Sequence, residues 1–392
     1  MQPIIIIGAG PVGLATAILL LQAGKQVKVF DKSLEINQTS RAWSIHSLSI
    51  DLLKEIGIQE AALAKGVKVG HIMTYNQRKP VVDLAFSELP ATHNYILSLP
   101  QFELEALLLA RFEALGGELR RGWEYVSSDH NKHLVQTCDG AKFEQVIGEY
   151  LIGCDGSRSK VRGHADIDFK GDMFQRGFLV IDAKLTHPFD RTKGHTFLTK
   201  KQGYVMLYPL PEGNTRLIMD VNYGAARSLD KSTEVLQAQI RNELDKRGFA
   251  DIQVQQLLWH SLTRHREMLA SSYVKDNVIL AGDAAHIHSP AGGQGVNLGL
   301  QDAVMLAKVL NQPKELHRKG LAQYAQKRRQ AAQQVITTTN AITELYTNPS
   351  FACQLKRRLL LPLMGKAKKK IARTVFNLSG HGLRPLMETE QD

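Results

Sequence analysis

The sequence predicts an α/β protein: a Rossmann-like nucleotide-binding domain with an inserted antiparallel β-sheet domain and a helical C-terminal region. Three observations predict this fold. The chain opens with an apolar strand, a glycine-rich turn and a helix. Residues 176–222 change to short strands joined by polar turns. A buried strand then returns near Val278 and ends in Gly282-Asp283, so two nucleotide-binding segments flank the sheet segment.

The first segment has the spacing of a dinucleotide-binding turn. Ile4 to Ile7 form an all-apolar strand, as expected for a strand buried on both faces. In the turn that follows, Gly8 makes a tight bend, Gly10 lets the backbone approach a pyrophosphate, and Gly13 lets the next helix pack closely.

The helix and strand after this turn complete a βαβ opening. The helix is predicted from Val12 to about Ala23, and the next strand from Val27 to Phe30. Asp31 ends that strand, about where a ribose-binding acid is expected. An ordinary glycine-rich turn is the alternative, but it does not explain why strand, spacing and acid occur together. We therefore predict dinucleotide binding.

Helices and short strands are predicted between the two nucleotide-binding segments. The helices run from His46 to Ile56 and from Gln101 to Leu115, and the strands lie between Glu118 and Tyr150. Arg41 precedes the first of these helices. It could pair with a pyrophosphate through its planar guanidinium, or it could be a surface arginine.

Residues 154–162 again join a strand to a helix. Ser157 and Ser159 are residues that cap helices, and Arg158 and Arg162 add positive charge near the helix start. A capped structural turn and an anion-binding turn both fit this pattern.

The inserted segment carries aromatic and basic candidates for a substrate site. Tyr204 and Tyr208 alternate with apolar residues, so both point to one face of a strand. They could form a packed aromatic pair, or a phenol there could hydrogen-bond a substrate hydroxyl and lower its pKa. Arg216 could anchor a substrate carboxylate, but an exposed strand arginine is the expectation. A helix from Thr233 to Arg247 and a strand from Gln253 to Trp259 are predicted to follow.

The second nucleotide-binding segment begins at the strand near Val278. The Asp283 carboxylate is placed to accept hydroxyl groups. Backbone N–H groups from Gly293 to Asn297 have no partner in the helix that they begin, so they face an anion or an electron-rich carbonyl. His286 and His288 lack a third ligand at a suitable spacing, which favours structural or cofactor-contacting histidines over a metal site.

Composition and charge limit the function classes. Hydrophobic residues make up 43% and charged residues 22%, and no apolar run approaches the ~20 residues of a membrane span. Three widely spaced cysteines predict neither a metal cluster nor a disulfide framework, so a cytoplasmic location is expected.

The net charge of +11 is concentrated near the C-terminus. From residue 311 onward there are fifteen Lys/Arg and five Asp/Glu, which accounts for +10 of this charge. This tail could be a packed helix pair, or it could bind the inner membrane face peripherally. Few aromatic residues lie there, so no nucleic-acid partner is expected; a homodimer is left open.

Three motifs together resemble a known family. Gly8-x-Gly10-x-x-Gly13, Asp155-Gly156 with Arg162, and Gly282-Asp283 followed by Pro290 and the Gly292–Asn297 loop occur in that order. They are similar to those of the single-component FAD-dependent aromatic hydroxylases with the para-hydroxybenzoate hydroxylase fold. The resemblance covers roughly residues 3–310, and it is more specific for fold than for substrate.

The resemblance implies FAD as the cofactor, with NAD(P)H as a transient co-substrate. Asp155 and Gly156 would contact both, Asp283 would bind the ribityl chain, and the loop from Pro290 would lie at the isoalloxazine. The full set of implied FAD contacts is Gly8, Gly10, Pro11, Val12, Gly13, Asp31, Lys32, Arg41, Gln101, Asp155, Gly156, Gly282, Asp283, Gly293, Gly295, Val296 and Asn297.

The implied reaction is hydroxylation of a phenolic or other small aromatic substrate. NAD(P)H would reduce FAD, O2 would add at flavin C4a, and the resulting hydroperoxide would deliver one oxygen to the ring. Tyr204, Tyr208 and Pro290 are the candidate catalytic positions, and no metal is expected.

The order of the nucleotide-binding and sheet segments along the chain predicts a division into domains. Residues 1–70, 98–175 and 270–320 would form a discontinuous FAD-binding domain. Residues 71–97 and 176–269 would form the substrate-binding sheet domain, and residues 321–392 a basic helical region.

Three other functions stay open at this point. A ubiquinone-pathway hydroxylase would act on a lipophilic quinone precursor, and a flavin-dependent reductase would need no O2. A non-catalytic module would keep the fold and bind a membrane or partner through the tail. A flavin halogenase is disfavoured because Trp43, Trp123 and Trp259 stand alone, without a Trp-x-Trp element.

Overall fold

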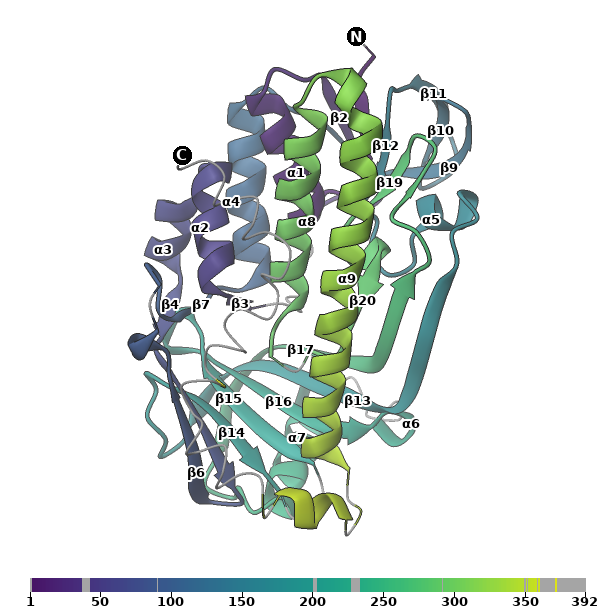
Figure 1. The fold of residues 1–392 in the computed structure, drawn as a ribbon. Coiled ribbons are helices and arrows are strands. Elements are labelled where there is room, and N and C mark those ends of the chain that lie inside the picture. Colours follow the sequence, from purple (N-terminus) through teal and green to yellow (C-terminus); the bar gives the residue numbers. More distant parts are fainter. Residues whose placement is uncertain are drawn as a thin grey trace.

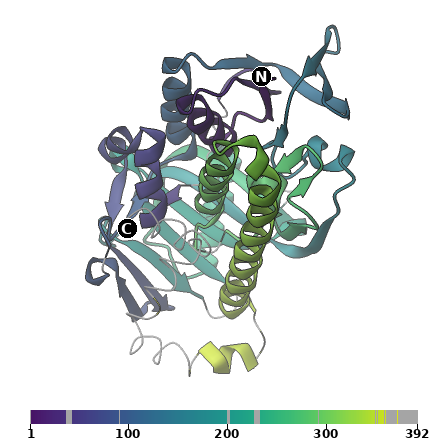
Figure 2. The same ribbon diagram turned by 45° about the horizontal axis from the view of Figure 1, so that its top comes forward.

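The computed structural model describes residues 2–36, 43–89, 91–199, 203–226, 233–290, 292–348, 350, 352–357, 359 and 371. A part built on a parallel sheet lies above a large, mainly antiparallel sheet, and the long helix α9 (Lys314–Thr347) runs along both (Figure 1). The turned view shows α9 and its neighbour α8 (Gly295–Leu310) passing over the large sheet (Figure 2). The predicted fold class is confirmed.

The parallel sheet has six strands in the order β18-β19-β12-β1-β2-β8. All pairs are parallel except β18 with β19. The four isoleucines of β1 are buried, because this strand lies inside the sheet and is covered on both faces. The strands are β1 (Ile4–Ile7), β2 (Val27–Asp31), β8 (Glu118–Arg121), β12 (Leu151–Gly153), β18 (Val274–Lys275) and β19 (Val278–Leu280).

Helices pack against this sheet through their apolar residues. Helix α1 contacts both α4 and α8, and its leucines and alanines join one continuous apolar core with β1 and β2. The helices of this part, besides α8 and α9, are α1 (Pro11–Gln22), α2 (Ser47–Ile56), α3 (Gln59–Lys65), α4 (Gln101–Ala114) and α5 (Lys160–His164). Gly57 ends α2 in the left-handed conformation that favours glycine, with φ 86°.

The large sheet has eight strands in the order β20-β17-β13-β16-β15-β14-β5-β6. Neighbours are antiparallel except β14 with β5. The strand expected from Gln253 to Trp259 is too short, because β17 continues to Ala270 and pairs along its whole length with β13. The strands are β5 (His71–Asn76), β6 (Lys79–Ala85), β13 (Phe169–Thr186), β14 (Gly194–Leu198), β15 (Tyr204–Pro209), β16 (Thr215–Asn222), β17 (Gln253–Ala270) and β20 (His286–Ile287).

The two faces of the large sheet bury different sets of residues. One face packs against α7 (Thr233–Lys246) through residues such as Leu217 and Met219. The opposite face, which we call the aromatic face, is turned toward the parallel sheet and α9 (Figure 1). Its buried apolar residues are Val82, Leu84, Phe178, Val180, Leu198, Tyr204, Met206, Tyr208 and Ile218. Residues of other elements pack on this face in the same apolar cluster, namely Trp43, Val69, Phe86, Leu89, Ile96 and Leu210.

Smaller elements complete the described chain. Two three-stranded sheets have the orders β11-β10-β9 and β3-β7-β4. None of the described helices is long and apolar enough to span a bilayer. Helix α9 passes through residue 320 without a break, so the expected boundary at 320/321 falls inside one helix. The remaining elements are β3 (Ser44–Ile45), β4 (Val67–Val69), β7 (Ile96–Ser98), β9 (Trp123–Asp129), β10 (Lys132–Thr137), β11 (Phe143–Ile147), α6 (Tyr223–Ala226) and the short helices η1 (Phe86–Glu88), η2 (Pro211–Gly213) and η3 (Gly282–Ala284).

Candidate active site

The motifs singled out in the sequence meet at one edge of the parallel sheet. Gly8 follows β1, Asp31 ends β2, Asp155 follows β12 closely, and Gly282 follows β19. These four strands are consecutive neighbours in the sheet. Ligands of open α/β sheets bind outside the carboxyl ends of the strands. The structure therefore gathers the predicted cofactor residues at the edge where a nucleotide is expected.

The three glycines of the first turn have different tasks. At Gly8, with φ 107°, a Cβ atom would lie 2.2 Å from the carbonyl oxygen of Cys154, and at Gly13 it would lie 1.9 Å from that of Gly8. Both glycines are therefore needed for the fold itself. At Gly10 a Cβ atom would have no described atom within 4 Å. Gly10 thus leaves open space in front of the α1 N-terminus, where Pro11 starts the helix and its first N–H groups are available to a phosphate.

Two acidic residues lie near this turn, Asp31 at the end of β2 and Glu105 on α4. Asp31 accepts hydrogen bonds from the Ala9 N–H (2.6 Å) and the Ser33 N–H (2.7 Å), while Lys32 is exposed. Glu105 of α4 is buried and was not predicted from the sequence, although it is a charged residue within an apolar helical run. Burial raises the pKa of Glu105, a rise that the hydrogen bond from Gln101 Nε2 (2.7 Å) opposes and the nearby Asp31 supports.

Asp155 and Arg162 connect the second and third motifs. Asp155 Oδ2 accepts the Lys160 and Val161 N–H groups, at 2.7 and 3.2 Å, whereas its buried Oδ1 has no partner among the described residues. Burial raises the pKa of Asp155, against the hydrogen bonds that it accepts. Arg162 donates to the carbonyl oxygens of Ala284 (2.8 Å) and Ser157 (3.2 Å). It therefore holds the Asp155-Gly156 turn against the Gly282-Asp283 turn.

Buried charged side chains of α8 and α9 hold the Gly282-Asp283 turn in place. Asp302 of α8 accepts the Gly282 N–H (3.0 Å), His286 Nε2 (2.7 Å) and Arg328 Nε (2.6 Å). Burial alone would raise the pKa of Asp302, but His286 and Arg328 outweigh it and hold the pKa below its ordinary value. Asp283 itself is exposed on η3, in keeping with a side chain that meets a ligand.

The loop of residues 290–297, without residue 291, is held by the segment that begins at Trp43. Asn297 donates through Nδ2 to the carbonyl oxygens of Ser44 (2.9 Å) and Gly293 (2.7 Å), and its Oδ1 accepts the His46 N–H (2.8 Å). A Cβ atom at Gly293, with φ 62°, would lie 1.9 Å from the Ser44 hydroxyl. Gly295 and Val296 begin α8, so their N–H groups have no partner within the helix.

His288, at the entrance to this loop, is a neutral histidine. Its Nδ1 lies 2.7 Å from the Ser289 carbonyl oxygen, so Nδ1–H donates, and its buried Nε2 has no partner among the described residues. Burial lowers the pKa of His288 to about 4. The unprotonated Nε2 therefore offers a lone pair close to Gly295.

Replacing His288 with glutamine is expected to make stability less sensitive to acid. The folded pKa of about 4 lies below the unfolded value of 6.5, so the unfolded chain binds a proton first as pH falls. The contribution of His288 to the free energy of unfolding is therefore fully present above about pH 6.5. It declines toward pH 4, by up to about 3 kcal/mol. Thermal unfolding between pH 4 and 7 would show a shallower decline for the variant. The exposed His130→Gln substitution is the control, and equal slopes for both variants would contradict the expectation.

Both candidate tyrosines lie on the aromatic face. The Tyr208 ring is 4.1 Å from Trp43, and the Tyr204 ring is 6.2 Å from both Phe178 and Tyr346 of α9. Burial raises the pKa of Tyr208 to about 12 and raises that of Tyr204 further. Both phenols are therefore protonated hydrogen-bond donors at neutral pH. Pro290, the third candidate, is exposed, and its carbonyl oxygen accepts the Gly293 N–H (3.0 Å).

Arg216 is not the exposed strand arginine that the sequence suggested. It is completely buried on β16, between β13 and β15, and Asp182 accepts from its Nε (2.7 Å) and Nη2 (2.6 Å). The sequence prediction was wrong because β16 is an interior strand of the sheet. The alternation of polar and apolar residues along a strand does not show whether that strand is interior or at an edge. Arg41 lies outside the described residues, as does nearly all of the basic segment after residue 357.

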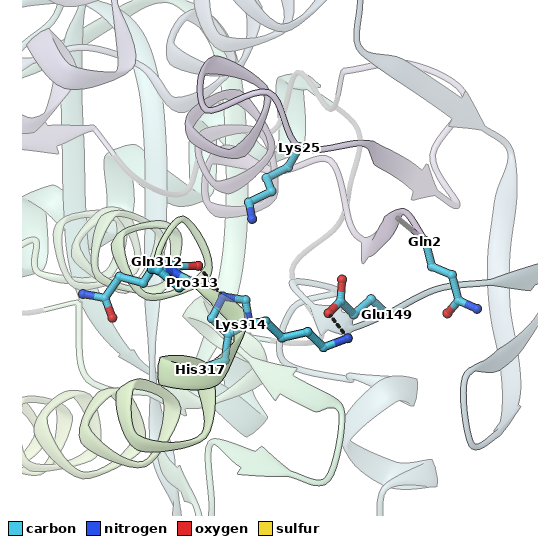
Figure 3. Close-up of a pocket in the computed structure, with 7 residues that line it drawn as sticks. All are labelled: Gln2, Lys25, Glu149, Gln312, Pro313, Lys314 and His317. Atoms are coloured by element: carbon cyan, nitrogen blue, oxygen red, sulfur yellow. Dashed lines mark hydrogen bonds and ion pairs between the residues drawn. The ribbon is translucent and has the colours of Figure 1, made fainter.

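A cavity of about 320 Å³ is lined by residues that include Gln2, Lys25 and Glu149 (Figure 3). Gln2 precedes β1 and Glu149 precedes β12, so the cavity is at the amino ends of strands whose carboxyl ends carry the motifs. Lys314 fills part of its wall and pairs with Glu149 (2.8 Å), and His317 bonds the Gln312 carbonyl oxygen (2.9 Å). This cavity is therefore separate from the cofactor edge.

The residues at the cofactor edge fit an extended dinucleotide such as FAD. The open space at Gly10 and the α1 N-terminus suit a pyrophosphate, and exposed Asp283 suits a hydroxylated chain. Asp155 follows β12 at the same edge, and its buried Oδ1 has no partner among the described residues. No cluster of three or more potential metal ligands occurs among the described residues.

Comparison with known proteins agrees with this geometry. The model of the FAD binding domain family matches residues 1–339. A rifampicin monooxygenase of Streptomyces venezuelae is 33% identical over 373 residues, which cover 93% of this chain and 75% of that protein. An uncharacterized aromatic compound monooxygenase of Bacillus subtilis is 33% identical over 353 residues, with coverages of 87% and 68%.

A solved structure shows the same fold. The p-nitrophenol 4-monooxygenase of Pseudomonas putida matches with a TM-score of 0.83 and 19% identity, over 97% of this chain and 98% of that chain. Together, the family match and the relatives settle the cofactor domain and the enzyme class. The chain belongs to the FAD-binding family of flavoprotein monooxygenases with the para-hydroxybenzoate hydroxylase fold, and it is an FAD-dependent aromatic monooxygenase.

Proposed function

We propose that this enzyme uses NAD(P)H and O2 to hydroxylate a phenolic small molecule held between the 290–297 loop and the aromatic face. One observation carries the proposal: a single segment joins the two surfaces. Ser44 is bonded to the loop through Asn297, and the preceding residue, Trp43, packs on Tyr208 of the sheet. The names of the two monooxygenase relatives, which refer to rifampicin and to aromatic compounds, support an aromatic substrate.

The protein's own residues have three tasks in this reaction. When bound, FAD supplies the redox chemistry that couples NAD(P)H oxidation to oxygen transfer. The N–H groups that begin α8 stabilise negative charge at their end of the ring system. The buried aromatic face excludes water, and a tyrosine hydroxyl there donates a hydrogen bond to the substrate phenol oxygen and stabilises its anionic form.

Removal of the Tyr208 hydroxyl is expected to slow hydroxylation. In Tyr208→Phe, turnover should fall by about 100-fold, the lower end of what a positioned proton donor contributes. The pH profile should show no tyrosine ionisation between pH 6 and 10, because the pKa of Tyr208 is raised to about 12. Product formation is measured at saturating phenol. Tyr75→Phe is the control, because that hydroxyl bonds His195 on the opposite side of the sheet. Equal turnover in both variants would remove Tyr208 from the mechanism.

Anaerobic reduction of the flavin tests the proposed function. The purified holoprotein is mixed with NADPH or NADH under nitrogen, with and without a panel of phenols, and the flavin absorption band is followed. We expect a phenol to accelerate reduction and air to give a hydroxylated product. Sustained turnover with an organic acceptor under nitrogen, without any response to aromatics, would point to a reductase instead.

A further inference from the structure

The aromatic face contains a buried ion pair, Arg216 with Asp182. The two groups meet in the bidentate geometry of a guanidinium and a carboxylate, with Arg216 Nε to Asp182 Oδ1 at 2.7 Å and Nη2 to Oδ2 at 2.6 Å. The guanidinium lies 5.7 Å from the Trp259 ring centroid. Its Nη1 is buried and has no hydrogen-bond partner among the described residues.

The pair lies in the same cross-strand row as Tyr208. Arg216 is opposite Tyr208 on β15 and opposite Asp182 on β13, and paired residues of neighbouring strands point to the same face. The residue after Arg216, Leu217, packs on the α7 side instead. Arg216 and Asp182 therefore belong to the surface on which we place the substrate ring.

Asp182 changes what this arginine can bind. A free guanidinium binds a carboxylate with two parallel hydrogen bonds, but here that edge is already taken. The pair has no net charge, so a substrate carboxylate would bring an uncompensated negative charge into a buried site. A neutral carbonyl or hydroxyl oxygen could accept from Nη1 without that cost.

We propose that Asp182 is a specificity-determining residue, which makes Arg216 a charge-neutral hydrogen-bond donor and selects uncharged oxygen-bearing phenols over aromatic carboxylates. The inference rests on the proposed function, because it assigns the substrate class of the same site.

Matched substrate pairs test this inference in the wild-type holoenzyme. Each pair has the same phenolic ring with a carboxamide or a carboxylate: hydroxybenzamide with hydroxybenzoate, and hydroxynaphthamide with hydroxynaphthoate. Binding is measured from the change in flavin absorption, and acceleration of anaerobic flavin reduction is measured in parallel. We expect the amides to bind at least tenfold more tightly. Equal or tighter binding of the acids would overturn the inference but leave the proposed function intact. Failure of every phenol to bind would overturn both.

A charge-removing variant tests the role of Asp182. In Asp182→Asn the guanidinium keeps its positive charge, so the amide-to-acid preference should fall at least tenfold. Asp83→Asn, on the edge strand β6 of the same sheet, is the matched control and should keep the wild-type preference. An unchanged preference in folded Asp182→Asn would overturn the inference.

A second variant covers the case in which Asp182→Asn does not fold. Replacing a buried ion pair by apolar residues of similar size is often tolerated, so Asp182→Leu combined with Arg216→Met is expected to fold. The preference of this double variant for a hydroxybenzamide over the unsubstituted phenol should be at least tenfold weaker than that of the wild type, because the Nη1 donor is gone. Wild-type discrimination in this double variant would overturn the inference.

Discussion

Replacing Gly10 with valine is expected to abolish tight FAD binding while the protein still folds. The Gly10 backbone is extended, with φ −74° and ψ −176°, so a valine can adopt it without strain. A Cβ atom there meets no described atom within 4 Å, but it projects into the space in front of the α1 N-terminus where we place the pyrophosphate. We expect the dissociation constant of FAD to rise at least about 100-fold, equivalent to about 3 kcal/mol.

Titration of the apoprotein with FAD, followed by flavin fluorescence, measures this effect. Gly70→Val is the control, because a Cβ atom at Gly70 also meets no described atom within 4 Å and Gly70 lies between β4 and β5, outside the three motifs. Thermal unfolding of both apoproteins should match the wild type. Wild-type FAD affinity in Gly10→Val would mean that the pyrophosphate does not lie at this turn.

Removing the charge of Asp302 is expected to destabilise the protein strongly and to weaken FAD binding. In Asp302→Asn the buried Arg328 guanidinium loses the carboxylate charge that it faces at 2.6 Å, and breaking a buried pair in this way costs about 3–5 kcal/mol. Asp251→Asn is the matched control. It breaks the partly exposed Arg78–Asp251 pair, for which about 0–1 kcal/mol is expected. Chemical denaturation of the apoproteins measures both costs.

A double variant separates stability from the positioning of the Gly282-Asp283 turn. Asp302→Leu with Arg328→Met removes both charges and should recover part of the lost stability. FAD affinity should remain reduced, because the Gly282 N–H and His286 still lack their acceptor. If FAD affinity recovered together with stability, Asp302 would have only a structural role.

Much of the fold was predictable because local patterns and global structure agree. Two turns could be recognised because only glycine suits some of their positions. One follows the apolar run Ile4–Ile7, and the other follows the strand that ends in Gly282-Asp283. Their order along the chain then predicted the inserted sheet, which the structure confirms. The roles of the individual FAD-contacting residues and the division into domains stay predictions.

The remaining features depend on contacts between distant parts of the chain. Asp302 and Arg328 lie on two helices, and nothing in their spacing reveals that Arg328 bonds Asp302 or that Asp302 also bonds His286. Arg216 looked like a surface residue because strand alternation identifies faces but does not say that β16 is central. Likewise, residues 260–270 are rich in polar side chains, so only the pairing with β13 shows that β17 continues through them.

The fate of molecular oxygen distinguishes a hydroxylase from a flavoprotein that only reduces O2 to peroxide. The holoenzyme is reduced anaerobically with NAD(P)H in the presence of the phenol that best accelerates reduction. It is then mixed with ¹⁸O2 and the products are analysed by mass spectrometry. We predict a hydroxylated phenol that carries one ¹⁸O atom, with little hydrogen peroxide. If reoxidation yields only peroxide and unchanged substrate, for every phenol and for neutral polycyclic aromatics as well, the enzyme is not a hydroxylase of such compounds.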